Sequence, residues 1–189
     1  MSQLFLLRHG STSAPGRFCG STDSVLTREG WRQMWAAVAG HVWHRVVSST
    51  ARRCADFGAC CARRLNVPFN EDARLREMHF GDWEGCSPAE LMQSAPEALQ
   101  RFWQEPVRHP PPRAEPLAAV RMRVLSAWNE LVAGDPAQRI LVVTHGGPMR
   151  VLRFALDPRA SERLLDIAVP YATLWDMSGF LRTAEASAH

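Results

Sequence analysis

The sequence predicts an α/β fold, a three-layer α/β/α sandwich with a mainly parallel central sheet. Short continuous apolar runs alternate with longer segments whose apolar residues recur at helical spacing, as expected for buried strands joined by helices that cover both faces of a sheet. The chain has 189 residues, of which 46% are hydrophobic and 22% charged, enough for one soluble domain with its own core. We therefore expect a single domain over residues 1–189, with the last six residues frayed.

The first third of the chain is expected to contain two strands and two helices. A strand at Gln3–Leu7 is followed by a loop over residues 10–23 that is rich in Ser, Thr, Gly and Pro. Thr27 can cap a helix that continues to about Ala39. A second strand at Arg45–Ser48 then leads into a helix over Ala51–Leu65, with Phe57, Cys61 and Leu65 spaced by four along its apolar face.

The remainder begins with a loop and short extended segments over residues 70–85. One or two helical pieces follow at Pro88–Glu105, broken by prolines, and the proline-rich segment 109–116 is a surface connection. The later elements are a helix at Leu117–Val132, a buried strand at Arg139–Thr144, a helix with Pro148 in its first turn, and two strands at Ala172–Met177 and Gly179–Arg182.

Composition argues against several classes of protein. The longest apolar runs are too short to cross a membrane, and the N-terminus lacks a secretory signal, so we expect a cytoplasmic protein. Five cysteines without CxxC spacing predict reduced thiols rather than a zinc site or disulfides. The formal net charge is +3, and all 22 basic residues are arginines scattered among acids, which does not indicate a nucleic-acid-binding face.

Two histidines each end an apolar strand and precede a glycine. His9 follows the first strand, and His145 follows the strand at Arg139–Thr144. Ligands of open α/β sheets gather beyond the carboxyl ends of the strands. If the two strands are neighbours, the two imidazoles lie side by side at that edge.

Four motifs connect these histidines to a known family. LLRHGST, SSTARRC, EMHFGDWEG and VTHGGPMR occur in this order between residues 4 and 150. Together they resemble the histidine phosphatase superfamily, which is phosphoglycerate-mutase-like, and the loop APGRFCGSTD is similar to its α-ribazole phosphatase branch. The resemblance implies the phosphoglycerate-mutase-like fold and a phosphomonoester hydrolase that acts through a phosphohistidine intermediate, without cofactor or metal.

The resemblance also assigns catalytic roles. His9 would attack phosphorus, Arg8 and Arg53 would neutralise the phosphate, and His145 would hydrogen-bond the transferring phosphoryl group. Neighbouring guanidinium groups should lower the pKa of His9 and keep it neutral, and Gly10 should allow a sharp turn beside it. The S-x-x-x-R block selects Arg53 rather than Arg52, which we expect to be solvated.

Glu77 is the expected general acid and base, because the family motif places the acid first. Glu84 is the alternative for this role, although we expect it to tie the loop to neighbouring backbone. Candidate substrate contacts are Thr12, Cys19, Gly20 and Gly146. Thr12 stands in for an Asn that the family often has after RHG.

Other histidines have competing interpretations. His79 could touch substrate or simply pack. His41 and His44 are three apart, which suits a metal, but no third ligand is evident and a solvated face is the favoured interpretation. Trp83 is expected to pack.

The length of one connection indicates which activity of the family to expect. The short connection from Glu77 to His145 favours a phosphatase over a mutase, because a mutase must shield its phosphoenzyme from water. We expect a small phosphorylated substrate, α-ribazole 5′-phosphate of cobalamin assembly. The alternatives are a broad-specificity or phosphoprotein phosphatase, a phosphoglycerate mutase, and a phospho-ligand-binding module without turnover. The oligomeric state is not predicted.

Overall fold

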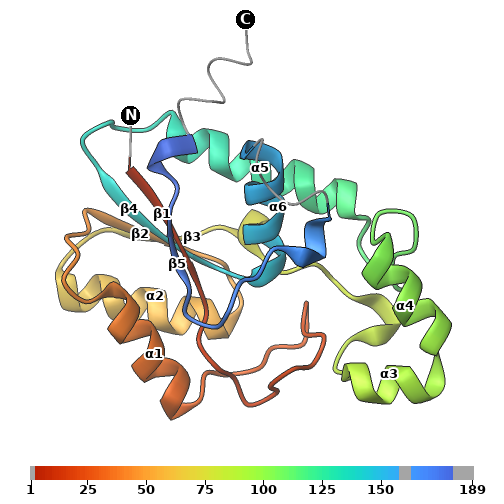
Figure 1. The fold of residues 1–189 in the computed structure, drawn as a ribbon. Coiled ribbons are helices and arrows are strands. Elements are labelled where there is room, and N and C mark those ends of the chain that lie inside the picture. The colour runs from red at the N-terminus through yellow and green to blue at the C-terminus, as the bar shows by residue number, and fades with distance from the viewer. Residues whose placement is uncertain (1–2, 158–162, 181–189) are drawn as a thin grey trace, which may run out of the picture.

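The central layer is a sheet of five strands in the order β3-β2-β4-β1-β5 (Figure 1). The computed structural model describes residues 3–157 and 163–180. All pairings are parallel except that of β5 with β1. The strands are β1 (Gln3–Arg8), β2 (Arg45–Ser48), β3 (Phe69–Glu71), β4 (Arg139–Thr144) and β5 (Leu174–Asp176).

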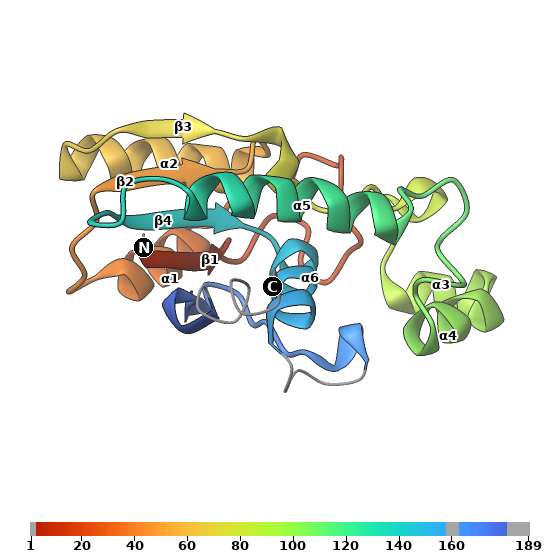
Figure 2. The ribbon, with the colours of Figure 1, turned by 90° about the horizontal axis from the view of Figure 1, so that it is seen from above.

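Helices cover both faces of the sheet, which confirms the expected sandwich. Helices α1 (Arg28–Val38) and α2 (Arg52–Leu65) lie on one face, and α5 (Leu117–Val132) and α6 (Gly146–Leu156) lie on the other (Figures 1 and 2). Within the described residues, no helix combines the length and hydropathy needed to span a membrane.

Alternation along the buried strands separates the two cores. In β1, Leu4 and Leu6 belong to the core beneath α5 and α6, whereas Phe5 and Leu7 belong to the core beneath α1 and α2. These four side chains are at most 5% exposed. A continuous apolar run is therefore required, because successive side chains of a strand point to opposite faces.

Side-chain caps fix the starts of two helices, one of which, at Thr27, the sequence indicated. The Thr27 hydroxyl accepts the N–H of Gly30 at 3.0 Å and begins α1. Ser87 and Glu90 form a capping box at the start of α3 (Pro88–Ser94). Pro96 separates α3 from α4 (Pro96–Gln104), as the proline pattern predicted.

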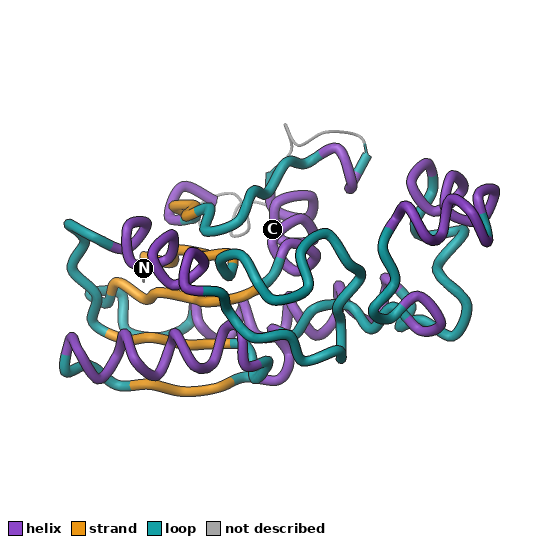
Figure 3. The backbone as a smooth tube through the Cα atoms, turned by 90° about the horizontal axis from the view of Figure 1, so that it is seen from below, coloured by secondary structure: helices purple, strands orange, loops and turns teal. Residues whose placement is uncertain are grey.

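Helices α3 and α4 extend past the sheet. In Figure 2 they lie beyond the end towards which the arrows of β1, β2 and β4 point, which is the carboxyl edge, and Figure 3 shows these two helices set apart from the strands. Their small core contains Leu91, Leu99 and Phe102 with Trp83, which packs as expected. This pair of helices thus stands beside the edge where the two histidines are expected.

Two expectations about strands and helices are corrected. Residues 178–180 form a single turn of 3₁₀-helix rather than a strand. Residues 181–182, which the predicted strand included, lie outside the described residues, and so do the last six. Leu65 ends α2 with 40% of its surface exposed instead of joining the buried face, because the chain turns at Asn66 in a left-handed conformation with φ of 54°.

Candidate active site

The carboxyl ends of three neighbouring strands place the histidine motifs side by side. Arg8 at the end of β1 pairs in register with Thr144 at the end of β4, and the His9 N–H donates to the Thr144 carbonyl at 3.0 Å. The next residues are therefore adjacent, and the ring centroids of His9 and His145 are 5.3 Å apart. The juxtaposition expected from the sequence is present.

His9 is held as one neutral tautomer. Its Nδ1 lies 2.8 Å from the carbonyl of Gly10, and because a carbonyl only accepts, Nδ1 carries the hydrogen and Nε2 keeps its lone pair. The pKa of His9 is lowered to about 3, first by burial and then by the charge of Arg53, with a smaller effect of Arg8 and an opposing one from the Gly10 carbonyl. The expected direction is confirmed, but burial exceeds the arginines as its cause.

Gly10 serves packing rather than a sharp turn. A Cβ atom at Gly10 would lie 2.3 Å from the carbonyl oxygen of Gly30, at the start of α1. Gly10 is also absent from the glycines with positive φ. The expectation of a turn was therefore wrong, since the glycine is needed because the backbone after His9 lies directly against α1.

Arg53 is buried at the first turn of α2. It is 1% exposed, and its guanidinium donates to the carbonyls of Thr22 at 3.1 Å and Cys19 at 2.7 Å. Arg52 points outward instead, with its Nε 3.6 Å from Asp56. The choice of Arg53 over Arg52 for the site agrees with this placement.

His145 stands behind Arg53. The Nε–H of Arg53 donates to His145 Nδ1 at 3.2 Å, and His145 Nε2 lies 2.8 Å from the hydroxyl of Ser49, just after β2. Because Nδ1 accepts, Nε2 carries the hydrogen and donates to Ser49. Burial, the charge of Arg53 and neighbouring His9 together keep the pKa of His145 well below its ordinary value. Both ring nitrogens are therefore occupied within the protein.

Arg8 brings a second guanidinium to the same edge. It donates to the carbonyl of Val169 and lies over the ring of Tyr171, 4.3 Å from the centroid. Its Nε is buried and has no hydrogen-bond partner within the described residues. A buried donor without a partner is costly unless a ligand satisfies it. Arg8 is thus equipped to receive an anionic oxygen.

Glu77 faces the N-terminus of α6. Its Oε2 accepts the N–H of Gly147 at 3.1 Å, and its Oε1 accepts the N–H of Met78 at 3.0 Å. A Cβ atom at Gly147 would come within 2.0 Å of the Glu77 carboxylate. The glycine that follows Gly146 therefore leaves room for the acid.

Glu84 holds the loop that carries Cys19 and Gly20, in agreement with the structural interpretation of this residue. Its carboxylate accepts backbone N–H groups of Gly20, Ser21, Thr22 and Phe80 at 2.9–3.1 Å, and the Thr22 hydroxyl at 2.7 Å. Burial alone would raise the pKa of Glu84, but these hydrogen bonds outweigh it, and the pKa is lowered.

A cavity of about 250 Å³ opens between these groups. The predicted residues that line it are Arg8, His9, Thr12, Cys19, Arg53, Glu77 and Gly146. His145 and Gly20 are not among the described lining residues. Gly20 instead donates to Glu84, so its backbone holds the loop.

Among the cavity residues that sequence reasoning missed, Arg150 and Tyr171 bear most on the chemistry. Arg150 lies four residues after Gly146 on α6, and a Cβ atom at Gly146 would be 3.0 Å from its Nη1. The spacing of four inside the VTHGGPMR motif could have indicated this. Tyr171 comes from the loop before β5, with its ring 5.6 Å from His9, and no nearby motif signals it.

The cavity is electropositive. Among the described residues, none of Arg8, Arg53 and Arg150 forms an ion pair, and Glu77 is the one carboxylate that lines the cavity. Gly146 adds the N-terminus of α6, where backbone N–H groups favour an anion. An anion with several oxygens, such as a phosphate, suits this surface.

The other histidines lie elsewhere. His79 is exposed and accepts the N–H of Gly81 at 3.0 Å, outside the cavity. His41 stacks on Trp43 with ring centroids 5.3 Å apart, and the Nδ1 of His44 accepts the N–H of Arg139 at 2.9 Å. Both are on an exposed face, as interpreted from the sequence. No group of three or more His, Cys, Asp or Glu side chains suited to a metal ion occurs within residues 3–157 and 163–180.

Comparison with known proteins identifies the family. The model of the histidine phosphatase superfamily (branch 1) matches residues 4–178. A bifunctional protein of Mycobacterium tuberculosis is 37% identical over 164 residues, which are 82% of this chain but 44% of that protein. The chain thus spans less than half the length of this relative.

Two solved structures are similar over nearly the whole chain. A mycobacterial glucosyl-3-phosphoglycerate phosphatase has a TM-score of 0.80 and 30% identity, covering 92% of this chain and 91% of the other. The α-ribazole phosphatase of Shigella flexneri has a TM-score of 0.75 and 27% identity, covering 91% and 88%. The chain therefore belongs to the histidine phosphatase superfamily, branch 1.

Proposed function

We propose that this chain hydrolyses phosphomonoesters through a phosphohistidine formed on His9. The observation that carries the proposal is the hydrogen bond from Nδ1 to the Gly10 carbonyl, which leaves the Nε2 lone pair free in a cavity rich in guanidinium groups. A buried neutral imidazole with a fixed tautomer is an activated nucleophile.

Substrate binding comes first. The phosphate carries nearly two negative charges, which Arg8, Arg53 and Arg150 neutralise together with the N-terminus of α6. The unpartnered Nε–H of Arg8 donates a hydrogen bond to a phosphate oxygen. Neutralising the oxygens reduces their repulsion of the incoming lone pair of His9.

Attack and hydrolysis then proceed in two steps. His9 Nε2 forms a bond to phosphorus while the phosphorus–oxygen bond of the ester breaks, and Glu77 gives its proton to the departing alkoxide. Water next attacks the phosphohistidine, Glu77 removes its proton, and the nitrogen–phosphorus bond breaks to release inorganic phosphate. Glu77 serves as acid and then as base, as microscopic reversibility requires.

His145 contributes to this proposal through Arg53. With Nδ1 bonded to Arg53 and Nε2 to Ser49, His145 orients the guanidinium that faces the phosphate. A direct hydrogen bond from His145 to the transferring phosphoryl group, as expected from the family resemblance, stays a prediction. It requires the imidazole to leave Ser49.

The substrate we propose is α-ribazole 5′-phosphate, whose dephosphorylation is a step of cobalamin assembly. The loop APGRFCGSTD and the similarity to the Shigella flexneri enzyme support this choice. Glucosyl-3-phosphoglycerate is the second candidate, supported by the similarity to the mycobacterial phosphatase. Steady-state kinetics with both esters and a panel of simple phosphomonoesters would rank them, and kcat/KM should be highest for α-ribazole 5′-phosphate.

Replacement of the nucleophile tests the mechanism. We expect His9→Ala to abolish hydrolysis of phosphomonoesters and to remove the acid-labile ³²P label that the wild-type enzyme acquires from labelled substrate. His44→Ala is the matched control, because His44 is exposed and outside the cavity. Full activity of His9→Ala, or an unchanged label, would refute the phosphohistidine mechanism.

A further inference from the structure

A second cavity, of about 320 Å³, adjoins the cavity of about 250 Å³ at His9, which we call the phosphate cavity. Phe18, Glu77, Phe80, Pro88 and Arg150 line both. The two cavities therefore lie side by side, and their shared wall includes the carboxylate of Glu77, which we have proposed as the acid. The second cavity lies between α3–α4 and the start of α5, at the carboxyl edge of the sheet seen in Figure 2.

The lining of this second cavity is almost entirely apolar. Glu77 and Arg150, both at the shared border, are its only charged residues among those described, and no hydroxyl or amide side chain is present. The remaining walls include Met78, Phe102, Trp103, Leu117, Val120 and Leu165. Trp103 keeps 38% of its surface exposed, so this wall is accessible from outside.

The position of the second cavity relative to Glu77 indicates which part of the substrate enters it. The acid must lie within hydrogen-bond reach of the oxygen that leaves with the alcohol. Since the phosphate occupies the arginine side of Glu77, the alcohol extends to the other side, into the apolar cavity. Its volume is within the range of about 300–1,000 Å³ typical of ligand pockets.

We propose that this second cavity binds the alcohol portion of the substrate and selects alcohols that carry an apolar ring. This inference rests on the proposed phosphatase activity. A polyhydroxylated alcohol would lose its hydrogen bonds with water and find no partners in these walls, whereas an apolar ring would exchange water for Phe, Trp and Leu side chains.

The test compares two esters whose leaving groups are similar primary alcohols, 3-phenylpropyl phosphate and 3-hydroxypropyl phosphate. We expect kcat/KM of the wild-type enzyme to be at least about tenfold higher for the phenyl ester. Equal values, or a preference for the hydroxyl ester, would overturn the proposal while leaving the phosphatase activity intact. Hydrolysis that survives in His9→Ala would instead overturn the proposed mechanism.

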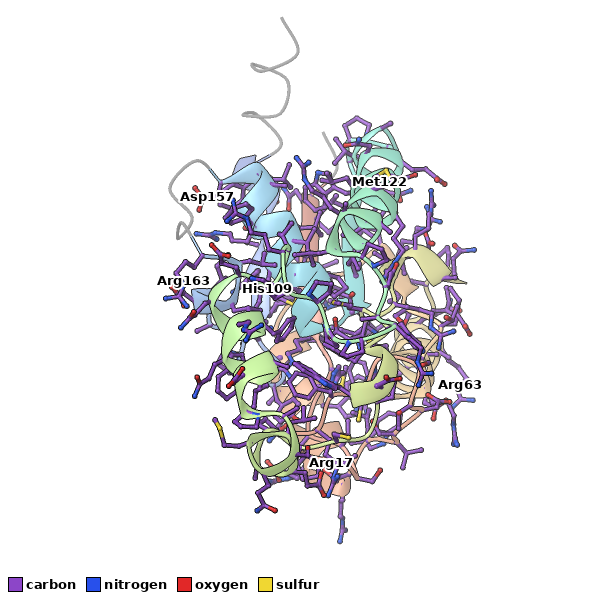
Figure 4. All side chains as sticks on the ribbon, turned by 90° about the vertical axis from the view of Figure 1, so that its right-hand side faces the viewer. Arg17, Arg63, His109, Met122, Asp157 and Arg163 are labelled. Atoms are coloured by element: carbon purple, nitrogen blue, oxygen red, sulfur yellow. The ribbon has the colours of Figure 1, made fainter. Side chains whose placement is uncertain are left out.

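Variants of the walls add a second measurement. Trp103→Gln and Leu117→Gln should each lower kcat/KM for the phenyl ester about fivefold or more beyond any loss on the hydroxypropyl ester, and thermal unfolding shows whether the variants are folded. Met122→Gln is the matched control, because Met122 is on α5 like Leu117 but 69% exposed (Figure 4). Equal losses on both esters in both wall variants, or an unchanged preference, would contradict the assignment.

Discussion

Backbone atoms hold each reactive side chain of the site. The carbonyl of Gly10 orients His9, the carbonyls of Cys19 and Thr22 orient Arg53, and two N–H groups orient Glu77. Backbone partners are fixed by the fold and leave little freedom to the side chain. The groups are thus organised before substrate arrives, which reduces the cost of reorganisation in the transition state.

Glu77→Gln should slow the hydrolysis of alkyl phosphates by about 10²–10⁴-fold, because the alkoxide then leaves without a proton. A nitrophenyl phosphate should lose far less, since its leaving group needs little protonation. The measurement is kcat for both esters in the wild type, in Glu77→Gln and in Glu71→Gln, whose exposed side chain is on β3. Equal losses for the two esters would assign the acid role to another residue.

Arg53→Met should lower kcat/KM for phosphomonoesters by about 10²–10³-fold, because it removes a preorganised cation from the cavity and the partner of His145. Arg52→Met is the matched control, because it makes the same substitution at the neighbouring arginine, which points outward, and it should retain wild-type activity. Thermal unfolding of both variants would separate misfolding from a catalytic defect. Comparable activity of the two variants would contradict the role of Arg53.

Sequence reasoning located the residues that strand ends and ordered motifs define. His9, Arg53 and Glu77 were found because each occurs within a recognisable block, and the strand register then brings those blocks together. Tyr171 was missed because it arrives from a loop before the one antiparallel strand, where pattern carries no information on contacts. The occupied nitrogens of His145 depend on rotamers, which periodicity does not specify.

Among the elements, the loop between β1 and α1 is held in place by residues from other segments of the chain. The Glu84 carboxylate accepts consecutive backbone N–H groups of this loop, and Arg17 of the loop forms an ion pair with Glu90 of α3. The carbonyls that hold Arg53 belong to the same loop. The contacts of Glu84 and Glu90 with this loop therefore help to position the guanidinium of Arg53 in the phosphate cavity.

Glu84→Gln should loosen this loop, because an amide NH₂ would face N–H groups that now donate to an oxygen. We expect about 1–3 kcal/mol of lost stability, faster hydrogen exchange at the amides of residues 20–22, and a higher KM. Glu97→Gln, on α4 with 81% of its side chain exposed, is the control and should change none of these. Unaltered exchange at residues 20–22 would show that Glu84 does not hold the loop.

At the scale of the whole molecule, the alternation of strands and helices predicted the three layers, whereas the ends of some elements depend on tertiary contacts. Buried strands and helical spacing predicted the sandwich, and the strands Arg45–Ser48 and Arg139–Thr144 have the predicted bounds. The turn at residues 178–180 departs from the predicted strand because the hydrogen bonds to β1 end at Met177. The N–H of Phe180 then donates to the carbonyl of Met177, which closes the turn. Such an ending depends on neighbours remote in the chain.

The stability of the molecule should depend on pH through its two buried imidazoles. In the folded protein the pKa of His9 is lowered to about 3 and that of His145 lies well below its ordinary value, so below about pH 6.5 the unfolded chain binds more protons than the folded protein. The free energy of unfolding should therefore be largest above about pH 6.5 and fall as pH decreases, by about 1.4 kcal/mol per pH unit for each histidine.

Urea unfolding from pH 7.5 to pH 4.5 would measure this slope. Carboxylates also contribute at the acid end, so the informative comparison is with His9→Gln, in which the slope between pH 6.5 and pH 5 should be lower by about one proton. His44→Gln serves as the control, because its exposed ring is not part of the buried pair. Identical slopes for the wild type and His9→Gln would contradict a buried neutral His9.

The pairing of Arg8 with Thr144 couples catalytic competence to the integrity of the sheet. A shift of β1 by one residue against β4 would invert every side chain of β1, exchange the two cores and turn His9 away from His145. Inactive but compact misregistered forms are thus strongly disfavoured. Enzymatic inactivation and loss of the sheet should consequently coincide in one cooperative transition.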